Sequence, residues 1–488
     1  MRISTGLGWR LEKLPRVALD DRNAEVSATH IRKQVEFSHL TTMRWRIWPG
    51  QGQQRRQRTK VNQGLAQRRR SLAITSSRKR KLGEEGLALT QISGTRGLAA
   101  QETAGKPRIL FLIDEIGGIA EGGTERQVLQ LIELAGRLGY EPRLAVLRGT
   151  EWLTAEQAGC LVYSAGVYSL LRPAGWRACL GLVNWMRRER ITLVQTFFVE
   201  CNIIGPWLAR MAGVPVVIGS RRNLNQWQGR VPWLGPAVRL LQRWANLSAD
   251  CVVANSLVAA EATVESEHIP QRKLHVAYNG IDLTKFSRLD TLRTEAREML
   301  GVGNEEILVG NISCMREVKG IPQFVDGARI ALESDPRLRF VVVGDGTEYA
   351  QVVERIRGYG LEDRIHLAGP QTDVLPYLAA MDIGVLSSLA EGFSNSLLEY
   401  MASGLASIAT DVGGNREALE DTGILIPPDD PEALAGAILR LSSATLRQQL
   451  GFAARRRVER FSLARAEKRM EEIYGDLLQA KGNLRHDH

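Results

Sequence analysis

The sequence predicts an α/β protein with two doubly wound domains that face each other across a cleft, preceded by a disordered basic extension. The chain of 488 residues is longer than one ordinary core accommodates. From Arg108 onward, short apolar runs alternate with amphipathic stretches, which is the pattern of βα units around a parallel sheet. The turn-like segment Asn279–Asp282 separates two such series, so we expect two sheets.

The first 105 residues account for the positive charge of the chain. They hold 21 Lys and Arg residues against 8 Asp and Glu, whereas the remainder has a small excess of acids. No sustained apolar period runs through them, so we expect little burial and no stable fold. We interpret residues 1–105 as a non-essential extension or as sequence translated from an upstream start. A nucleic-acid arm, a tether to anionic lipid and an Arg-rich transit peptide are the functional alternatives.

The two series of apolar runs set the expected domains. An N-terminal domain over residues 106–285 is predicted from strand-like runs at Ile109–Ile113, Leu144–Leu147, Leu193–Phe197, Val214–Ile218 and Cys251–Ala254. A C-terminal domain over residues 286–460 is predicted from runs at Ile307–Ile312, Phe340–Val343, Ile365–Leu367, Ile383–Leu386 and Ala406–Thr410. A helical stretch over Leu463–Leu478 then ends the fold.

One segment, Glu391–Glu399, carries two carboxylates around an expected helix start. It follows an apolar, strand-like run, and Ser394 begins a run of residues that favour helix N-termini. Parallel α/β sheets bind ligands at the carboxyl ends of their strands, and helix N-termini offer N–H groups to anions. Two hydroxyl-binding carboxylates around a phosphate-binding helix end suit a sugar nucleotide. Two solvated glutamates on an ordinary helix are the alternative.

Two loops elsewhere have groups that suit a diphosphate. Arg316 and Lys319 follow a strand, where cationic side chains would stabilise a departing phosphate. The glycine-rich loop before Glu125, with Gly122 and Gly123, would let backbone approach a phosphate or sugar. An exposed pair at a helix start and a plain turn are the respective alternatives. The glycine spacing does not match the dinucleotide fingerprint.

The ordered set of motifs resembles the retaining glycosyltransferases of family 4, of the glycosyl transferases group 1 type. Their donor-site signature is similar to the stretch from Glu391 to Glu417. The resemblance covers roughly residues 106–480 and implies the GT-B fold, with two Rossmann-like domains, acceptor first and donor second. It also implies that the last helix, residues 461–480, packs back on the first domain. The other matching segments are Gly122–Glu125, Ala212–Pro215, Ala254–Ser256, Tyr278–Asp282, Val318–Gly320 and Val343–Gly346.

This resemblance implies an enzyme that moves a sugar from a nucleotide-diphosphate sugar to a hydroxyl acceptor, with retention. Glu391 is the implied catalytic residue, holding hydroxyls of the transferred sugar, while Glu399 holds the ribose. No cofactor and no metal are expected, because cationic side chains and a helix end neutralise the phosphates. The full set of implied donor-binding residues is Gly122, Gly123, Arg316, Lys319, Ser396, Leu397 and Glu399.

The chain departs from the family pattern at two places. Cys314 stands where the commonest pattern has the phosphate-binding arginine, so that role passes to Arg316, as in a frequent variant. Gln195 stands in the run that often carries a histidine beside the sugar, and residues 106–250 contain no histidine. Glutamine donates and accepts hydrogen bonds but does not shuttle protons. We therefore expect an unusual subsite around Gln195.

The acceptor side is predicted from charge. Between Cys201 and Ala249 there is no Asp or Glu, while arginines and tryptophans recur. This composition attracts anions and favours a membrane interface, although helices packed with Trp and solvated by Arg fit equally well. We assign Gln195, Arg221 and Arg222 to the acceptor side. The expected acceptor is a glycan or lipid-linked glycan of cell-surface polysaccharide or glycolipid synthesis, with an anionic membrane surface as a further candidate partner and no nucleic acid.

Composition excludes several classes of protein. The five cysteines are scattered without a C-x-x-C, which argues against disulfides or zinc and fits a reducing cytoplasm. The longest apolar window, Ile203–Gly219, contains two prolines and an arginine, so no membrane-spanning segment is predicted. We expect a cytoplasmic enzyme, with peripheral contact to the inner face of the plasma membrane as one option. The alternatives are a GT-B-like epimerase or phosphorylase, and a non-catalytic binding protein with a nucleic-acid-contacting arm.

Overall fold

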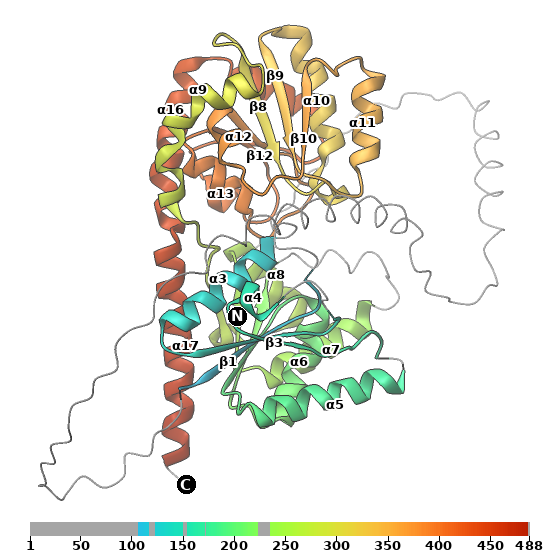
Figure 1. Cartoon of the computed structure of the whole chain (residues 1–488), viewed down its shortest axis with the longest axis vertical. Helices are drawn as coiled ribbons and strands as arrows, with labels where there is room; N and C mark the ends of the chain where they lie inside the picture. Colours follow the sequence, from blue (N-terminus) through green and yellow to red (C-terminus); the bar gives the residue numbers. More distant parts are fainter. Residues whose placement is uncertain (1–105, 117–122, 150–153, 171, 223–234, 487–488) are drawn as a thin grey trace, which may run out of the picture. The chain divides into compact units, whose positions relative to one another are not determined.

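The computed structural model describes residues 106–116, 123–149, 154–170, 172–222 and 235–486 (Figure 1). Two parallel sheets, of seven and six strands, confirm the predicted α/β class with two doubly wound, Rossmann-like units. The extension over residues 1–105, which we expect to be disordered, lies outside the described residues.

The first sheet has the strand order β3-β2-β1-β4-β5-β6-β7. All five expected runs form strands, and two further strands complete the sheet. These two, β3 and β7, are short and partly exposed, so they lack the apolar run that marks a buried strand. The strands are β1 (Arg108–Ile113), β2 (Glu141–Val146), β3 (Leu161–Ser164), β4 (Leu193–Thr196), β5 (Val216–Arg221), β6 (Cys251–Ala254) and β7 (Leu274–Val276).

Helices cover both faces of this sheet. Phe111 of β1 packs in one core with helix α3, whereas its neighbours Leu110 and Leu112 pack in another with α5 and α6. Burial on both faces explains why β1 is apolar at every interior position. The helices are α3 (Gly123–Arg137), α4 (Ala155–Ala158), α5 (Pro173–Arg188), α6 (Val199–Met211), α7 (Gly235–Ser248) and α8 (Leu257–Glu267).

The second sheet has the order β10-β9-β8-β11-β12-β13 and is likewise parallel. The short strand β13 is the one that the apolar runs do not predict. The strands are β8 (Ile307–Ile312), β9 (Leu338–Val343), β10 (Ile365–Gly369), β11 (Ile383–Leu386), β12 (Ala406–Thr410) and β13 (Ile424–Ile426).

Helices again cover both faces of the second sheet. One core includes α12 and α13, and the other includes α10 and α15. The segments are η3 (Leu283–Arg288), α9 (Leu289–Met299), η4 (Glu317–Lys319), α10 (Ile321–Ser334), α11 (Tyr349–Gly358), α12 (Leu375–Ala380), α13 (Asn395–Ala402), α14 (Asn415–Leu419), α15 (Pro431–Arg440), α16 (Ala444–Arg457) and η5 (Val458–Phe461).

The last helix, α17 (Leu463–His486), leaves the second sheet and packs on the first (Figure 1). Its Met470, Ile473 and Tyr474 lie in the same core as Phe111. The crossing is anchored where Ile281 pairs with the chain at Ser462, through backbone hydrogen bonds of 3.0 and 2.8 Å. The first sheet therefore depends on the C-terminal residues for part of its core.

Substitution of Ile473 therefore tests the stability of the first unit, which is the seven-stranded sheet with its helices. Ile473→Ala deletes a buried side chain and should lower the free energy of unfolding by about 2–5 kcal/mol, measured as a fall in the thermal midpoint. The control is Glu471→Ala, an exposed position on the same helix, which should leave the midpoint nearly unchanged. Equal midpoints for both variants would contradict the packing described here.

Candidate active site

The second sheet reverses its strand order between β8 and β11. From β8 the chain proceeds outward to β9 and β10, whereas from β11 it proceeds the opposite way to β12 and β13. Loops that leave two such neighbouring strands diverge and open a crevice at the carboxyl edge of the sheet. The loop after β8 contains Arg316 and Lys319, and the loop after β11 contains Glu391. Both predicted groups therefore lie at the switch point of this sheet.

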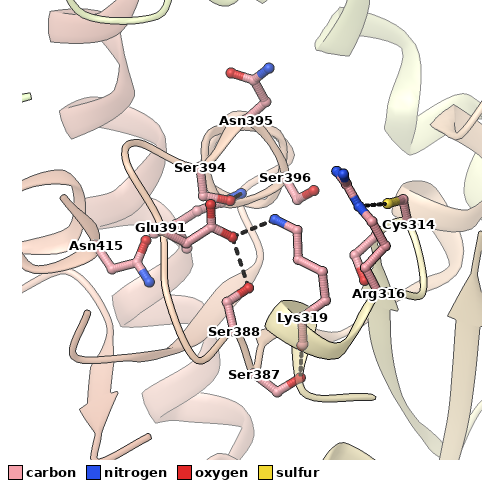
Figure 2. Close-up of polar contacts among 12 residues, drawn as sticks. Cys314, Arg316, Lys319, Ser387, Ser388, Glu391, Ser394, Asn395, Ser396 and Asn415 are labelled. Carbon is pink, nitrogen blue, oxygen red and sulfur yellow. Dashed lines mark hydrogen bonds and ion pairs between the residues drawn. The ribbon is translucent and has the colours of Figure 1, made fainter. Parts of the chain in front are cut away.

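Lys319 and Glu391 meet directly across this crevice (Figure 2). The Lys319 ammonium lies 2.6 Å from Oε1 of Glu391, and the Ser388 hydroxyl donates to the same oxygen at 2.8 Å. The Glu391 side chain is only 10% exposed. A buried carboxylate needs such donors, because burial without a partner is costly. The lysine ammonium and the glutamate carboxylate thus lie side by side, both largely buried.

Backbone contacts fix the distance between the two loops. Gly320 adopts φ 60°, and a Cβ atom there would collide with the Ser387 carbonyl oxygen. The Ser387 hydroxyl donates to the carbonyl of Lys319 at 3.0 Å, and Asn311 donates to that hydroxyl at 3.1 Å. Only glycine permits this approach, so Gly320 sets where Lys319 lies.

Helix α13 starts where the sequence predicts. Ser394 is its N-cap, and the Ser394 hydroxyl accepts from the Leu397 amide at 3.3 Å. The Ser396 hydroxyl donates to the carbonyl of Ile312 at the end of β8, at 2.7 Å, which ties the helix start to the strand. The Leu397 side chain is fully buried. In Figure 2, Ser394 and Ser396 at the start of α13 lie beside Glu391 and Lys319.

Glu399, one turn into α13, faces the first unit. Its carboxylate accepts from Arg126 of α3 at 3.0 Å. Burial raises the pKa of Glu399, and the positive charge of Arg126 opposes that rise. Gly123 lies nearby, since Asn395 donates to its carbonyl at 3.4 Å. Gly122, its predicted companion, lies outside the described residues.

The loop of Glu391 is held from the first unit. Asn279 donates to the Phe393 carbonyl at 3.0 Å and to the Asn395 side chain at 2.8 Å. The Ser256 hydroxyl donates to the Gly392 carbonyl at 3.1 Å. Gly392 itself lies against the backbone carbonyl of Arg222, where a Cβ atom would not fit. The residues that position Glu391 thus come from both units.

Arg222, assigned to the acceptor side, lies among these contacts between the two units. Its guanidinium donates to the Asn279 side chain, and burial lowers the pKa of Arg222 to about 10. Glu417 makes a second junction, because it accepts from the Leu257 amide at 2.9 Å and from the Tyr278 hydroxyl. The sequence motifs include Asn279, Ser256 and Glu417, but their roles as contacts between units follow only from the structure.

The remaining predicted residues have different surroundings. Arg316 donates from Nε to the sulfur of Cys314 at 2.9 Å, so the residue that replaces the usual arginine is its partner. Gln195 is buried, donates to Ser220 at 3.0 Å and accepts from Tyr474 of α17 at 2.5 Å.

Arg221 is also buried, in an ion pair of 2.8 Å with Glu267 and a hydrogen bond to Asn246. Gln195 and Arg221 therefore support the first unit from within, and their assignment to an acceptor remains a prediction.

Among the residues that the structure describes, no three His, Cys, Asp or Glu side chains gather closely enough to hold a metal ion. No helix in that part of the chain has the length and apolar character needed to cross a membrane.

Two family models match the chain. Residues 306–444 match the model described as glycosyl transferases group 1, and residues 122–280 match the glycosyl transferase 4-like domain. A Bacillus anthracis relative, N-acetyl-alpha-D-glucosaminyl L-malate synthase, is 32% identical over 303 residues, covering 61% of this chain and 78% of the relative. The chain belongs to the group 1 glycosyl transferases.

Further comparisons agree with this family and fold. An Escherichia coli relative, UDP-Gal:alpha-D-GlcNAc-diphosphoundecaprenol alpha-1,3-galactosyltransferase, is 23% identical over 315 residues, covering 62% of this chain and 80% of the relative. The structure of Anabaena HepE with UDP superimposes with a TM-score of 0.65 at 22% identity, over 76% of this chain and all of that one. WaaG, a glycosyltransferase of lipopolysaccharide biosynthesis, gives 0.60 at 15%, over 75% and 99%. The GT-B fold of the enzyme is thereby confirmed.

Gly320 provides a test of the crevice geometry in this glycosyltransferase. Gly320→Ala introduces both a strained φ and a collision with the Ser387 carbonyl, so it should destabilise the second unit by more than about 1 kcal/mol and displace Lys319. Thermal unfolding and sugar-nucleotide turnover are the measurements. Gly358→Ala, within α11 and with open space around it, should be neutral or stabilising. A tolerated Gly320→Ala would show that the loop spacing is not constrained in this way.

Proposed function

We propose that this glycosyltransferase moves a sugar from a nucleotide-diphosphate sugar to a hydroxyl acceptor with retention of configuration. The observation that carries the proposal is the Lys319–Glu391 pair at the switch point, beside the N-terminus of α13. A cation, a carboxylate and a helix N-terminus close together match two parts of such a donor, its diphosphate and its sugar. The phosphates pair with the cation and the amides, and the sugar hydroxyls pair with the carboxylate.

Lys319 and Glu391 have capacity beyond their mutual bond. An ammonium group has three donors, and one of them serves Glu391. The bonds from Lys319 and Ser388 both reach Oε1 of Glu391, so we assign Oε2 to a hydroxyl of the transferred sugar. Lys319 would then connect the sugar-binding carboxylate to the phosphate next to it. This coupling would align the bond that breaks with the groups that stabilise it.

We assign the nucleotide to the far side of α13. Glu399 would accept from the ribose hydroxyls, and its bond to Arg126 would be shared or exchanged as the ribose binds. The backbone amides at the start of α13, around Ser396, would donate to the phosphates. Leu397 contributes through its backbone, since its side chain is buried. Gly122 and Gly123 would bring the backbone of the first unit close to the donor.

For the reaction itself we propose front-side attack. The bond between the anomeric carbon and the phosphate oxygen breaks, the acceptor oxygen bonds to the same face, and its proton passes to the leaving phosphate. No protein base is required, which is consistent with glutamine at position 195. Arg316 and Lys319 would stabilise the growing charge on the diphosphate, so we propose that no metal is needed.

Relatives suggest the donor and acceptor classes. HepE of Anabaena was solved with UDP and with UDP-glucose, and the Escherichia coli relative is named for a diphosphoundecaprenol acceptor. We therefore propose a uridine diphosphate sugar as the first donor to test. For the acceptor we propose a glycan or lipid-linked glycan of cell-surface synthesis.

A panel of sugar nucleotides tests the reaction class. Release of nucleoside diphosphate that increases on adding an acceptor is the expected result. Isomerisation of the donor without an acceptor would identify an epimerase instead. If neither reaction occurs and no sugar nucleotide raises the thermal midpoint, the chain is a binding protein without this site.

Substitution of Glu391 separates turnover from binding. Glu391→Gln keeps the shape but removes the charge, and should lower kcat by roughly 100-fold or more while KM for the donor changes little. Steady-state kinetics measure both constants. Glu333→Gln, an exposed glutamate on α10, is the control and should match the unmodified enzyme. Unchanged kcat in Glu391→Gln would remove this residue from the mechanism.

Substitution of Lys319 tests the phosphate site. Lys319→Ala should weaken binding of the nucleoside diphosphate roughly tenfold or more, because a charge-assisted bond to phosphate is lost. Calorimetric titration with UDP provides the measurement. Lys468→Ala, an exposed lysine on α17, is the matched control. Equal affinities for UDP in the two variants would mean that the diphosphate binds elsewhere.

A further inference from the structure

Two adjacent helices of the first unit expose an apolar strip. Trp207 of α6 stacks on Trp244 of α7, with ring centroids 6.5 Å apart. Both tryptophans are exposed, and the most exposed member of the strip, Leu247, is 69% accessible. Apolar patches on a monomer surface mark interaction sites more often than chance. We define the α6–α7 strip as Trp207, Met211, Leu240, Leu241, Trp244 and Leu247.

The charges on the two helices of the α6–α7 strip are positive or neutralised. Arg243 is exposed beside Trp244, and α7 contains no acidic residue. The one acid of α6, Glu200, lies in its first turn, away from Trp207, and pairs with Arg148. Asp250, just after α7, is bound by Arg210 at 2.7 Å and by Lys481 at 3.0 Å. The described acids of α6 and the acid that follows α7 are therefore paired, whereas α8, which also packs against α7, exposes Glu261 and Glu265.

The neighbouring helix, α5, also exposes apolar and basic side chains. Helix α5 lies on the same face of the sheet as α6, and the three helices lie together in Figure 1. It exposes Trp176 and Leu180, and its charged residues are all arginines, namely Arg177, Arg187 and Arg188. Of the predicted mixture of Trp and Arg, the side chains of Trp207, Trp244 and Arg243 are exposed, whereas Arg221 is buried against Glu267. Trp227, Trp233 and Arg230 of that prediction lie outside the described residues.

We propose that the α6–α7 strip docks on an anionic phospholipid bilayer. Tryptophan and leucine enter the boundary between headgroups and acyl chains, while arginine pairs with lipid phosphates. A second copy of this chain is a poorer occupant, because a two-fold interface would place Arg243 against the strip of the other copy, whose helix α7 contains no acid. The proposal goes beyond the reaction, since binding to vesicles requires neither donor nor acceptor.

The full chain is tested with vesicles of phosphatidylglycerol and phosphatidylcholine, and with phosphatidylcholine alone. Sedimentation should show binding to the anionic vesicles that falls as salt rises. The double variant Trp244→Ser/Leu247→Ser should bind at least about tenfold more weakly, because two apolar side chains no longer enter the interface. Arg243→Glu should weaken binding to anionic vesicles selectively.

The matched control is Met299→Ser/Phe452→Ser, which removes two exposed apolar side chains from the second unit and should bind like the unmodified chain. Thermal midpoints of all variants establish that they are folded. Absence of vesicle binding by the unmodified chain would overturn the proposal. So would equal binding by Trp244→Ser/Leu247→Ser, which would place the contact in residues 1–105 or elsewhere. A dimer that forms without lipid and is lost in this variant would instead assign the strip to a second copy.

Discussion

The approach of Gly320 to the carbonyl of Ser387 is the constraint on which the active site depends. It joins the loops that follow β8 and β11, two neighbouring strands whose connections run in opposite directions. Because the backbones touch, Lys319 and Glu391 are close enough to pair, and Ser396 can bind the carbonyl of Ile312. The close approach of the two backbones thus fixes the distance between the two loops and the position at which α13 starts.

The first unit reaches the Glu391 loop through polar contacts and through Tyr278, whose ring packs on Phe393 with centroids 5.2 Å apart. Asn279 and Ser256 bind main-chain carbonyls of the Glu391 loop, and Glu417 binds the start of α8. Such bonds have strict geometry and are expensive to leave unmade when buried. They couple the position of Glu391 to the first sheet. Helix α17, which continues the chain from the second unit, packs its apolar side on the core of that sheet.

The departures from the family pattern have local explanations in the structure. Cys314 accepts a hydrogen bond from Arg316, the arginine two residues later. Gln195 bonds at once to Ser220 and to Tyr474, which uses both the donor and the acceptor of its amide. In the first unit this position therefore connects α17 to β4. The α6–α7 strip lies on another part of the same unit and is not involved in any of these bonds.

The sequence by itself determined the α/β class, two sheets, the start of α13 and the positions of Glu391, Glu399 and Lys319, because apolar periodicity and capping residues act over short distances. It did not predict β3, β7 or β13, since short, partly exposed strands have no distinctive pattern. Only the tertiary structure decided that Lys319 pairs with Glu391, and that Arg221 is buried against Glu267. These partners are 72 and 46 residues apart, and such pairing depends on strand order, which local sequence does not encode.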